Sequence, residues 1–287
     1  MKRTYLWLKM FSIAVISSLM FFAGDCGTNN DNPPASTSVA APTNIKIRVD
    51  RSSGAFAVVS WDHSADKGKS DFKGYVVNTY AVDSSGNVIS QFRTDIVPSS
   101  SNSQIINSII PLTRYKSFVY AETNNSVKSD SVGSLIYAAV WANNDSLDQF
   151  QATGSAVSGY GWNTAFGIGT RYAYTTANAN LIDIHLRDEG GLRFYSPDQK
   201  TPGTRVTKFD LVGTGQEAYD RTDLLEPALT SIVVVENNVY LIKTQEGNYI
   251  KVWVKKINPP AGSRTYSYVT FDYKVQPIAG LRIVKRG

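Results

Sequence analysis

The sequence has 287 residues, of which 42% are hydrophobic and 18% charged, with a formal net charge of +5 at pH 7 and a single cysteine. One cysteine excludes an intramolecular disulfide. Apart from the pair Lys255-Lys256 and the basic C-terminal tail, lysines and arginines are scattered. A nucleic-acid-binding protein would gather them in a patch or stripe, so no nucleic-acid partner is expected.

Residues 1–25 predict a signal peptide. Basic residues precede an apolar run over residues 10–23, which is too short for a spanning helix and has the length of a secretory signal. The single cysteine, Cys26, follows directly, and its simplest use is attachment of lipid. The preceding residues resemble a bacterial lipobox, although Asp25 stands where that motif usually has a small residue. The alternative is ordinary cleavage nearby, which leaves Cys26 as a free thiol or removes it.

The segment 26–41 predicts a flexible tether, because it is rich in Asn, Pro, Ser, Thr and Ala and has almost no large apolar residue. After the leader, no run is long and apolar enough to cross a bilayer. The expected membrane partner is reached through the lipid on Cys26. These features predict a lipoprotein of the bacterial cell envelope, in the outer membrane and facing either the periplasm or the outside.

Residues 42–139 predict a first domain, an antiparallel β-sandwich. Short segments of alternating character are separated by turn residues, a pattern typical of such sandwiches. The residues of segment 83–87, Asp-Ser-Ser-Gly-Asn, suit a hairpin turn because Gly and Asn accept positive φ. The strands are expected at residues 44–49, 56–61, 74–82, 88–92, 104–109, 115–123 and 135–139.

This segment resembles a fibronectin type III module. The resemblance rests on residues in matching order and spacing: Pro42, Trp61, Gly74-Tyr75-x-Val77, Pro111-Leu112-x-x-Tyr115 and Val119-x-Ala121. It implies that Trp61 and Tyr75 fill the core between the sheets and that the hydroxyl of Tyr115 forms a hydrogen bond back across its corner. A sugar-stacking platform is the alternative role for these aromatic side chains.

Residues 140–287 predict a second, larger β-rich domain, so the expected fold class is all-β. A helix is expected at residues 219–226, closed by Pro227, with segment 220–223 as a capping alternative. Strands are expected at residues 181–187, 191–195, 205–212, 230–235, 239–244, 249–257 and 266–275.

Residues 157–176 are rich in glycine and aromatic residues. Glycine permits close backbone approach and sharp bends, which suits either a binding surface or a strongly twisted sheet edge. The aromatic residues Tyr160 and Trp162 are candidate ligand-binding residues on the first alternative.

The strand at residues 181–187 alternates in character. Asp183 and His185 fall on one face and are expected to point outward, with side chains about 7 Å apart by strand rise. They are candidate ligand-binding residues, and the alternative is a pair of solvated groups on an outer face.

Parts of the second domain are similar to the HmuY-like family, β-rich surface lipoproteins whose best-known members capture haem. The matching residues are Val239-Tyr240-Leu-Ile-Lys-Thr, Gly247-Asn-Tyr249-x-Lys251-Val252, Tyr268-x-Thr270-Phe271-x-Tyr273 and Asp183-Ile184-x-Leu186; the family's usual Trp before the Asp is Ile182 here. The resemblance implies haem as a candidate ligand. His185 is the one histidine of this domain, and all three methionines lie in the leader, so paired ligation by His and Met is excluded. The alternatives are ligation by His185 alone, ligation by His and Tyr, and shallow stacking of haem.

Catalytic motifs are absent from the sequence: it has no Gly-x-Ser-x-Gly elbow, no phosphate loop and no His-Glu-x-x-His metal motif. A glycosidase needs two carboxylates facing across a groove. Carboxylates are numerous in the second domain: Asp183, Asp188, Glu189, Asp198, Asp210, Asp220, Asp223 and Glu226.

The sequence therefore predicts a non-catalytic surface binding or adhesion module that requires no cofactor and has no metal site. The first domain acts as a spacer, and the second presents a surface for a protein, glycan or haem ligand. The alternatives are a haem-capturing lipoprotein, an accessory module of a carbohydrate-active enzyme or a glycosidase, and a purely structural role.

Overall fold

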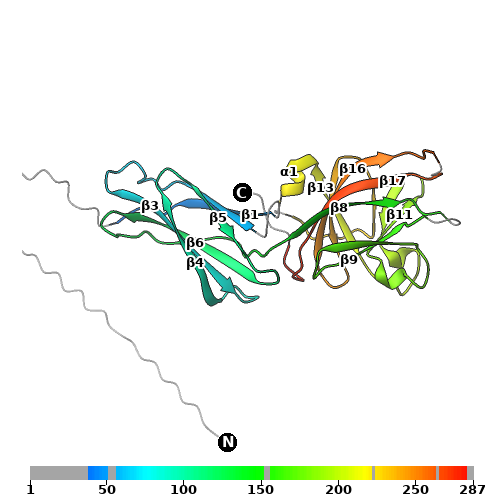
Figure 1. The fold of residues 1–287 in the computed structure, drawn as a ribbon, viewed down its shortest axis with the longest axis horizontal. Coiled ribbons are helices and arrows are strands. Elements are labelled where there is room, and N and C mark those ends of the chain that lie inside the picture. Colours follow the sequence, from blue (N-terminus) through cyan, green and yellow to red (C-terminus); the bar gives the residue numbers. More distant parts are fainter. Residues whose placement is uncertain (1–37, 51–55, 152–155, 222–223, 263–264, 283–287) are drawn as a thin grey trace, which may run out of the picture. The chain divides into compact units, whose positions relative to one another are not determined.

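The computed structural model describes residues 38–50, 56–151, 156–221, 224–262 and 265–282. The predicted leader, Cys26 and most of the predicted tether lie outside these residues. The described part is nearly all β, which confirms the predicted fold class (Figure 1). A fibronectin type III-like sandwich is followed by a second, larger β-rich domain.

The first sandwich consists of two antiparallel sheets. One sheet has the order β1-β2-β5 and the other has the order β4-β3-β6-β7, which is the three-plus-four arrangement of a fibronectin type III-like fold. The bounds of the strands are β1 (Thr43–Asp50), β2 (Phe56–Asp62), β3 (Phe72–Val82), β4 (Val88–Pro98), β5 (Ser103–Asn107), β6 (Arg114–Thr123) and β7 (Val132–Gly133).

Two predictions about the core of this sandwich are confirmed. Trp61 and Tyr75 are buried between the sheets, with ring centroids 5.2 Å apart in an edge-to-face arrangement. The hydroxyl of Tyr115 accepts a hydrogen bond from the backbone N–H of Ile110 at 3.0 Å, which closes the predicted corner. Asp83 also forms the predicted hairpin turn, since its carboxylate accepts hydrogen bonds from the backbone N–H groups of Ser85 and Asn87.

The second domain contains two five-stranded antiparallel sheets, with the orders β10-β9-β11-β12-β14 and β13-β15-β16-β17-β8. The strand bounds are β8 (Trp141–Asp148), β9 (Gly159–Asn163), β10 (Ile168–Tyr172), β11 (Ile184–Asp188), β12 (Leu192–Tyr195), β13 (Lys208–Thr214), β14 (Ser231–Val233), β15 (Asn238–Lys243), β16 (Tyr249–Asn258) and β17 (Tyr268–Val275). Three short helices connect them: η1 (Ala179–Leu181), η2 (Pro197–Gln199) and α1 (Gly215–Asp220).

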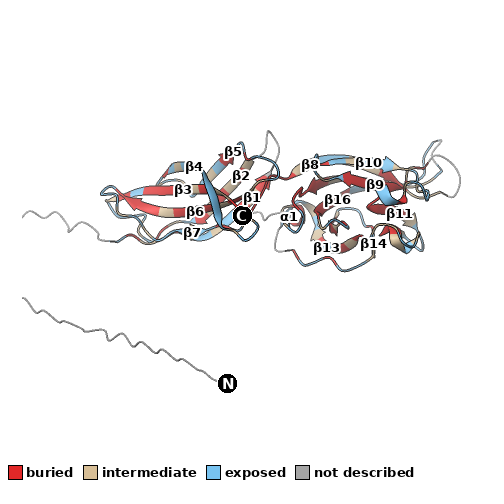
Figure 2. Ribbon diagram, turned by 90° about the horizontal axis from the view of Figure 1, so that it is seen from below, coloured by how far each residue is buried: buried red, intermediate tan, exposed pale blue. Residues whose placement is uncertain are grey.

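The inner faces of these two sheets form one hydrophobic core. Leu186 and Phe194 contribute from the first sheet, and Tyr240, Val252 and Phe271 contribute from the second. Alternate residues along each strand enter this core, as the period of a β-strand requires. Figure 2 shows the burial of each strand: β11 and β16 are largely buried, whereas the edge strands β4 and β10 are largely exposed.

The helix α1 and the last strand of the first sandwich differ from their predictions. The helix covers Gly215–Asp220 rather than residues 219–226, and its N-cap is Thr214, so segment 220–223 does not cap its start. The last strand of the first sandwich, β7, covers Val132–Gly133 rather than residues 135–139. Within the predicted strand, Tyr137 forms an isolated bridge with Tyr115.

The strand β8 had no counterpart among the predicted strands. Its sequence, WANNDSLD, is polar and lacks alternation, and Asn and Asp are depleted in strands. It nevertheless pairs along its whole length with β17 at the edge of the sheet. One side of an edge strand needs no partner, so pairing with β17 is enough to hold this polar segment.

Residues 38–41, the end of the predicted tether, pack on the first sandwich. Val39 is buried, and the backbone N–H of Ala40 donates to the Asp66 carboxylate at 2.8 Å. The hydroxyl of Ser64 donates in turn to the carbonyl of Ala40 at 2.7 Å. The chain is therefore fixed before the first strand begins.

Candidate functional site

A charged cavity of about 320 Å³ lies at one end of the second domain. Asp183 immediately precedes β11, Arg205 lies in the segment before β13, and Glu246 lies in the turn between β15 and β16. The cavity is lined by Gly161, Trp162, Asn163, Thr164, Thr170, Tyr172, Asn180, Leu181, Asp183, Arg205 and Glu246.

The guanidinium of Arg205 bridges two carboxylates in this cavity. Its Nε and Nη2 atoms donate to Oδ1 of Asp183 at 3.1 and 2.6 Å. Its Nη1 and Nη2 atoms donate to the two oxygens of Glu246 at 2.6 and 2.5 Å. Four of the five N–H bonds of Arg205 are therefore used, which fixes the orientation of its planar head group.

Asp183 is held from a second side. Its Oδ2 atom accepts a hydrogen bond from the backbone N–H of Trp162 at 2.8 Å, so one carboxylate joins β9 to Arg205. Burial raises the pKa of Asp183, and the guanidinium of Arg205 opposes that rise. At Glu246, burial also works to raise the pKa, but the hydrogen bonds and charge of Arg205, together with hydrogen bonds from its own backbone and from Thr244, leave that pKa below its ordinary value.

The two carboxylates differ in exposure. The side chain of Asp183 is 2% exposed and that of Glu246 is 52% exposed. Asp183 therefore forms the buried floor of the cavity, whereas Glu246 and part of Arg205 face its opening.

The glycines of the β9–β10 hairpin permit close packing around the cavity. A Cβ atom at Gly161 would lie 1.9 Å from the carbonyl oxygen of Leu181, and one at Gly169 would lie 1.9 Å from the hydroxyl of Tyr160. The strand β10 is the edge of its sheet. The glycine-rich segment thus allows neighbouring chain segments to pack closely at a sheet edge. Four of its residues also line the cavity: Gly161, Trp162, Thr170 and Tyr172.

The two aromatic candidates lie together in the hydrophobic core, with ring centroids 5.0 Å apart. Tyr160 is buried in the hydrophobic core, where its ring packs edge-to-face on Phe271 and its hydroxyl donates to Asp145 at 2.9 Å. Burial raises the pKa of Tyr160. The ring of Trp162 is buried in the same core beside Tyr273, and its backbone N–H donates to Asp183 at the edge of the cavity. Of the two, only Trp162 borders the cavity.

The expectation that His185 points outward is wrong. Its side chain is fully buried, stacks on Tyr174 with ring centroids 3.6 Å apart, and meets Phe150 edge-to-face at 5.3 Å. Neither ring nitrogen has a hydrogen-bond partner among the described atoms. Burial lowers the pKa of His185 to about 3, and the positive charges of Arg187 and Lys200 add to this effect.

Asp183 and His185 do not act as the predicted solvated pair. Asp183 is committed to Arg205 and the cavity, whereas His185 belongs to an aromatic cluster with Phe150 and Tyr174. The cavity instead recruits Arg205 and Glu246, which lie 41 residues apart in the chain. No motif in the sequence connects these two residues with Asp183.

Neither a group of metal-ligating side chains nor a helix able to span a bilayer occurs in the parts of the chain that the structure describes.

Comparisons with known proteins find no matching family model and no matching curated protein. Solved structures with some similarity are fibronectin type III domains. An Fn3-like protein from Clostridium thermocellum is 23% identical over 34% of this chain and 88% of that chain, with a TM-score of 0.25. The third fibronectin III domain of the human KIAA0343 protein is 15% identical over 39% and 93%, with a TM-score of 0.30. A two-domain fibronectin type-III segment of chicken tenascin is 13% identical over 75% and 92%, with a TM-score of 0.24. Similarities this low carry no information about function.

Breaking the buried ion pair tests the structural role of Asp183. Asp183→Asn should lower the free energy of unfolding of the second domain by about 3 kcal/mol, because Arg205 loses its buried partner. Glu246→Gln is the matched control, since it removes the other carboxylate of the same guanidinium from an exposed position and should cost less than about 1 kcal/mol. Urea denaturation measures both values. Equal losses in the two variants would contradict the assignment.

The burial of His185 predicts a pH dependence of stability. The unfolded chain binds a proton at this residue near pH 6.5, whereas the folded chain does so only near pH 3. Stability should therefore fall as the pH drops through this window, by up to about 1.4 kcal/mol per pH unit from this residue alone. In His185→Phe this part of the slope should vanish, with no loss of stability at pH 7. The control His63→Gln alters a more exposed ring and should change the slope less. Urea denaturation at pH 4, 5, 6 and 7 measures the effect, and an unchanged slope in His185→Phe would refute it.

Proposed function

We propose that this chain is a lipoprotein of the bacterial cell envelope that acts as a non-catalytic surface binding module. Its second domain presents the ligand site, and the charged cavity around Arg205 is the observation that carries this proposal. The first domain supports a binding role in general but no particular ligand, because fibronectin type III-like domains are generally binding or adhesion modules.

The wall of the cavity favours a small, neutral, hydroxyl-rich ligand such as a saccharide unit. Tyr172 contributes an aromatic ring, while Asn163, Asn180 and Thr170 contribute amide and hydroxyl groups. A volume of about 320 Å³ is at the lower end of the range for ligand pockets. Two carboxyl groups stand against one guanidinium in the cavity, which disfavours an anionic ligand.

The same geometry supports a binding rather than a catalytic role. A general acid or base must be free to exchange a proton with the substrate. Asp183 is 2% exposed, and both Asp183 and Glu246 are bound to the one guanidinium of Arg205. Neither carboxylate is therefore placed as a free proton donor or acceptor.

Haem does not fit the arrangement around His185. Haem ligation needs an imidazole nitrogen that can reach the iron, and both nitrogens of His185 are buried under neighbouring side chains. Phe150 and Tyr174 would have to move away before the ring could bind a metal centre. The cavity itself is polar and does not contain His185.

The membrane anchor is the second part of the proposal. Cys26 is the single cysteine of the chain, and residues 1–25 precede it as a predicted signal peptide. A flexible link that begins at Cys26 and ends before residue 38 would leave the two β-domains free to meet ligands away from the lipid surface, in the outer membrane and facing either the periplasm or the outside.

Mass spectrometry of the mature protein tests the anchor. The membrane fraction of expressing cells should contain a chain that begins at Cys26 and carries the mass of acyl groups. Cys26→Ser should abolish this species and shift the chain out of the membrane fraction, whereas the neighbouring control Thr28→Ala should leave it in place. A mature chain without lipid would make the protein a soluble secreted one.

A glycan array followed by calorimetric titration tests the cavity. We expect at least one neutral saccharide to bind, and Tyr172→Ala and Asn180→Ala each to weaken it about tenfold, because both residues line the opening and are not in the core. The control Thr176→Ala changes an exposed residue outside the cavity and should have no effect. If no saccharide binds, or binding is indifferent to both variants, the saccharide assignment fails and a protein-interaction role takes its place.

A further inference from the structure

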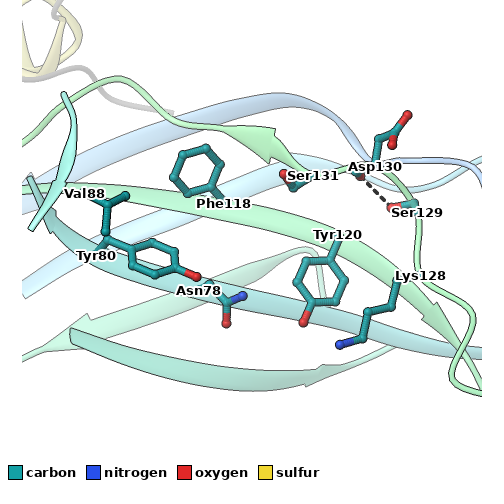
Figure 3. Close-up of a pocket in the computed structure, with 9 residues that line it drawn as sticks. All are labelled: Asn78, Tyr80, Val88, Phe118, Tyr120, Lys128, Ser129, Asp130 and Ser131. Carbon is teal, nitrogen blue, oxygen red and sulfur yellow. Dashed lines mark hydrogen bonds between the residues drawn. The ribbon is translucent and has the colours of Figure 1, made fainter. Parts of the chain in front are cut away.

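The outer face of the four-stranded sheet of the first domain contains a second groove, distinct from the charged cavity. Its volume is about 550 Å³, and three aromatic side chains from β3 and β6 form its floor: Tyr80, Phe118 and Tyr120 (Figure 3). Its other lining residues are Asn78, Val88, Lys128, Ser129, Asp130 and Ser131.

The three rings have no role in the core of the sandwich. Along β6, Tyr115, Val119 and Ala121 are buried and belong to the core, whereas Phe118 and Tyr120 alternate with them and face outward. The outer face of such a sheet usually carries polar side chains. A row of half-buried aromatic rings on this face therefore needs an explanation other than packing.

The rings form a continuous strip on rigid strands. Tyr80 and Phe118 meet edge-to-face with centroids 5.9 Å apart, and Phe118 and Tyr120 are two residues apart on one face of β6, a spacing of about 7 Å. Figure 3 shows the rings of Phe118 and Tyr120 following one another along the sheet, with the side chain of Asn78, from β3, between those of Tyr80 and Tyr120. Ring faces beside amide and hydroxyl groups match a sugar, which has C–H faces and a rim of hydroxyls.

Two lysines provide positive charge along the strip. The ammonium of Lys116 lies 5.2 Å from the ring centroid of Phe118, and that of Lys128 lies 5.0 Å from that of Tyr120. Neither lysine forms an ion pair with a carboxylate in the described parts of the chain. Of the nearby acids, Glu122 is paired with Lys73 at 3.5 Å, and Asp130 lies exposed at the rim.

We propose that this groove binds an acidic glycan, with sugar rings stacked on Phe118 and Tyr120 and carboxylates of the sugar paired with Lys116 and Lys128. The two lysines are the charge complement of an anionic chain, and their positions beside separate rings match a polymer with one charge per sugar unit. A single-stranded nucleic acid also stacks on aromatic rings, but it needs a basic groove that tracks every phosphate. Two lysines and Asp130 do not form such a groove.

Calorimetric titration of the mature chain with a hexamer of galacturonic acid tests the proposal. We expect the hexamer to bind, with an affinity that falls as salt rises from 20 to 200 mM, because exposed charges are screened. The comparison with a neutral sugar uses the Tyr172→Ala chain, whose charged cavity is weakened for neutral sugars; there maltohexaose should bind at least tenfold more weakly than the acidic hexamer. Phe118→Ala and Tyr120→Ala should each reduce the affinity for the acidic hexamer about tenfold.

Two further variants distinguish the sources of binding. The double substitution Lys116→Met and Lys128→Met keeps the rings and long apolar side chains, and should remove the preference for the acidic over the neutral hexamer. Tyr172→Ala changes the charged cavity of the second domain and should leave binding of the acidic hexamer to the groove unchanged. The groove proposal can therefore fail independently of the cavity proposal. The proposal is overturned by absence of binding, by equal binding of the neutral and acidic hexamers to the Tyr172→Ala chain, or by tighter binding of hexaglutamate or oligo-dT.

Discussion

The guanidinium of Arg205 ties together segments that precede or join strands of both sheets in the second domain. Asp183 leads into β11 of one sheet, whereas Arg205 leads into β13 and Glu246 joins β15 to β16 in the other. Burying charges costs desolvation energy, so such a pair is weak evidence for stability in itself. Its geometric effect is definite: four directed hydrogen bonds fix the ends of the two sheets, and the charged cavity is the space that this arrangement leaves.

Much of the fold was predictable because strand periodicity is a local property of the sequence. The hairpin of β15 and β16 follows from alternation and turn residues that lie close together in the chain, whereas the tyrosine corner at Tyr115 was implied by the resemblance to a fibronectin type III module. The polar strand β8 could not be found in this way. It is a strand because β17 pairs with all of it, and its partner lies more than a hundred residues further along the chain. Tyr137 shows the same limit, since a single bridge to Tyr115 replaced the predicted strand.

The site was predictable only in part, for a related reason. Alternation correctly placed Asp183 and His185 apart from the core residues Ile184 and Leu186, but alternation does not say what covers the second face. At His185 the second face is covered by Phe150 and Tyr174. Both residues lie in loops, and no pattern in the sequence of these loops predicts the contact. At Asp183 the cover is Arg205, 22 residues away. A charged residue inside a strand is thus ambiguous until its long-range partner is known.

The charged cavity and the aromatic groove differ in the sign of their net charge, and this difference affects which ligand each could bind. Asp183 and Glu246 outnumber the one guanidinium of the cavity, whereas Lys116 and Lys128 lie beside the rings of the groove. An anionic polymer that suits the groove is therefore repelled by the cavity. One uniform acidic glycan would not occupy both sites, so simultaneous use of the two requires either two ligands or one glycan with acidic and neutral stretches. In the second case the two sites would raise each other's effective ligand concentration, and modest affinity at each would suffice for firm attachment.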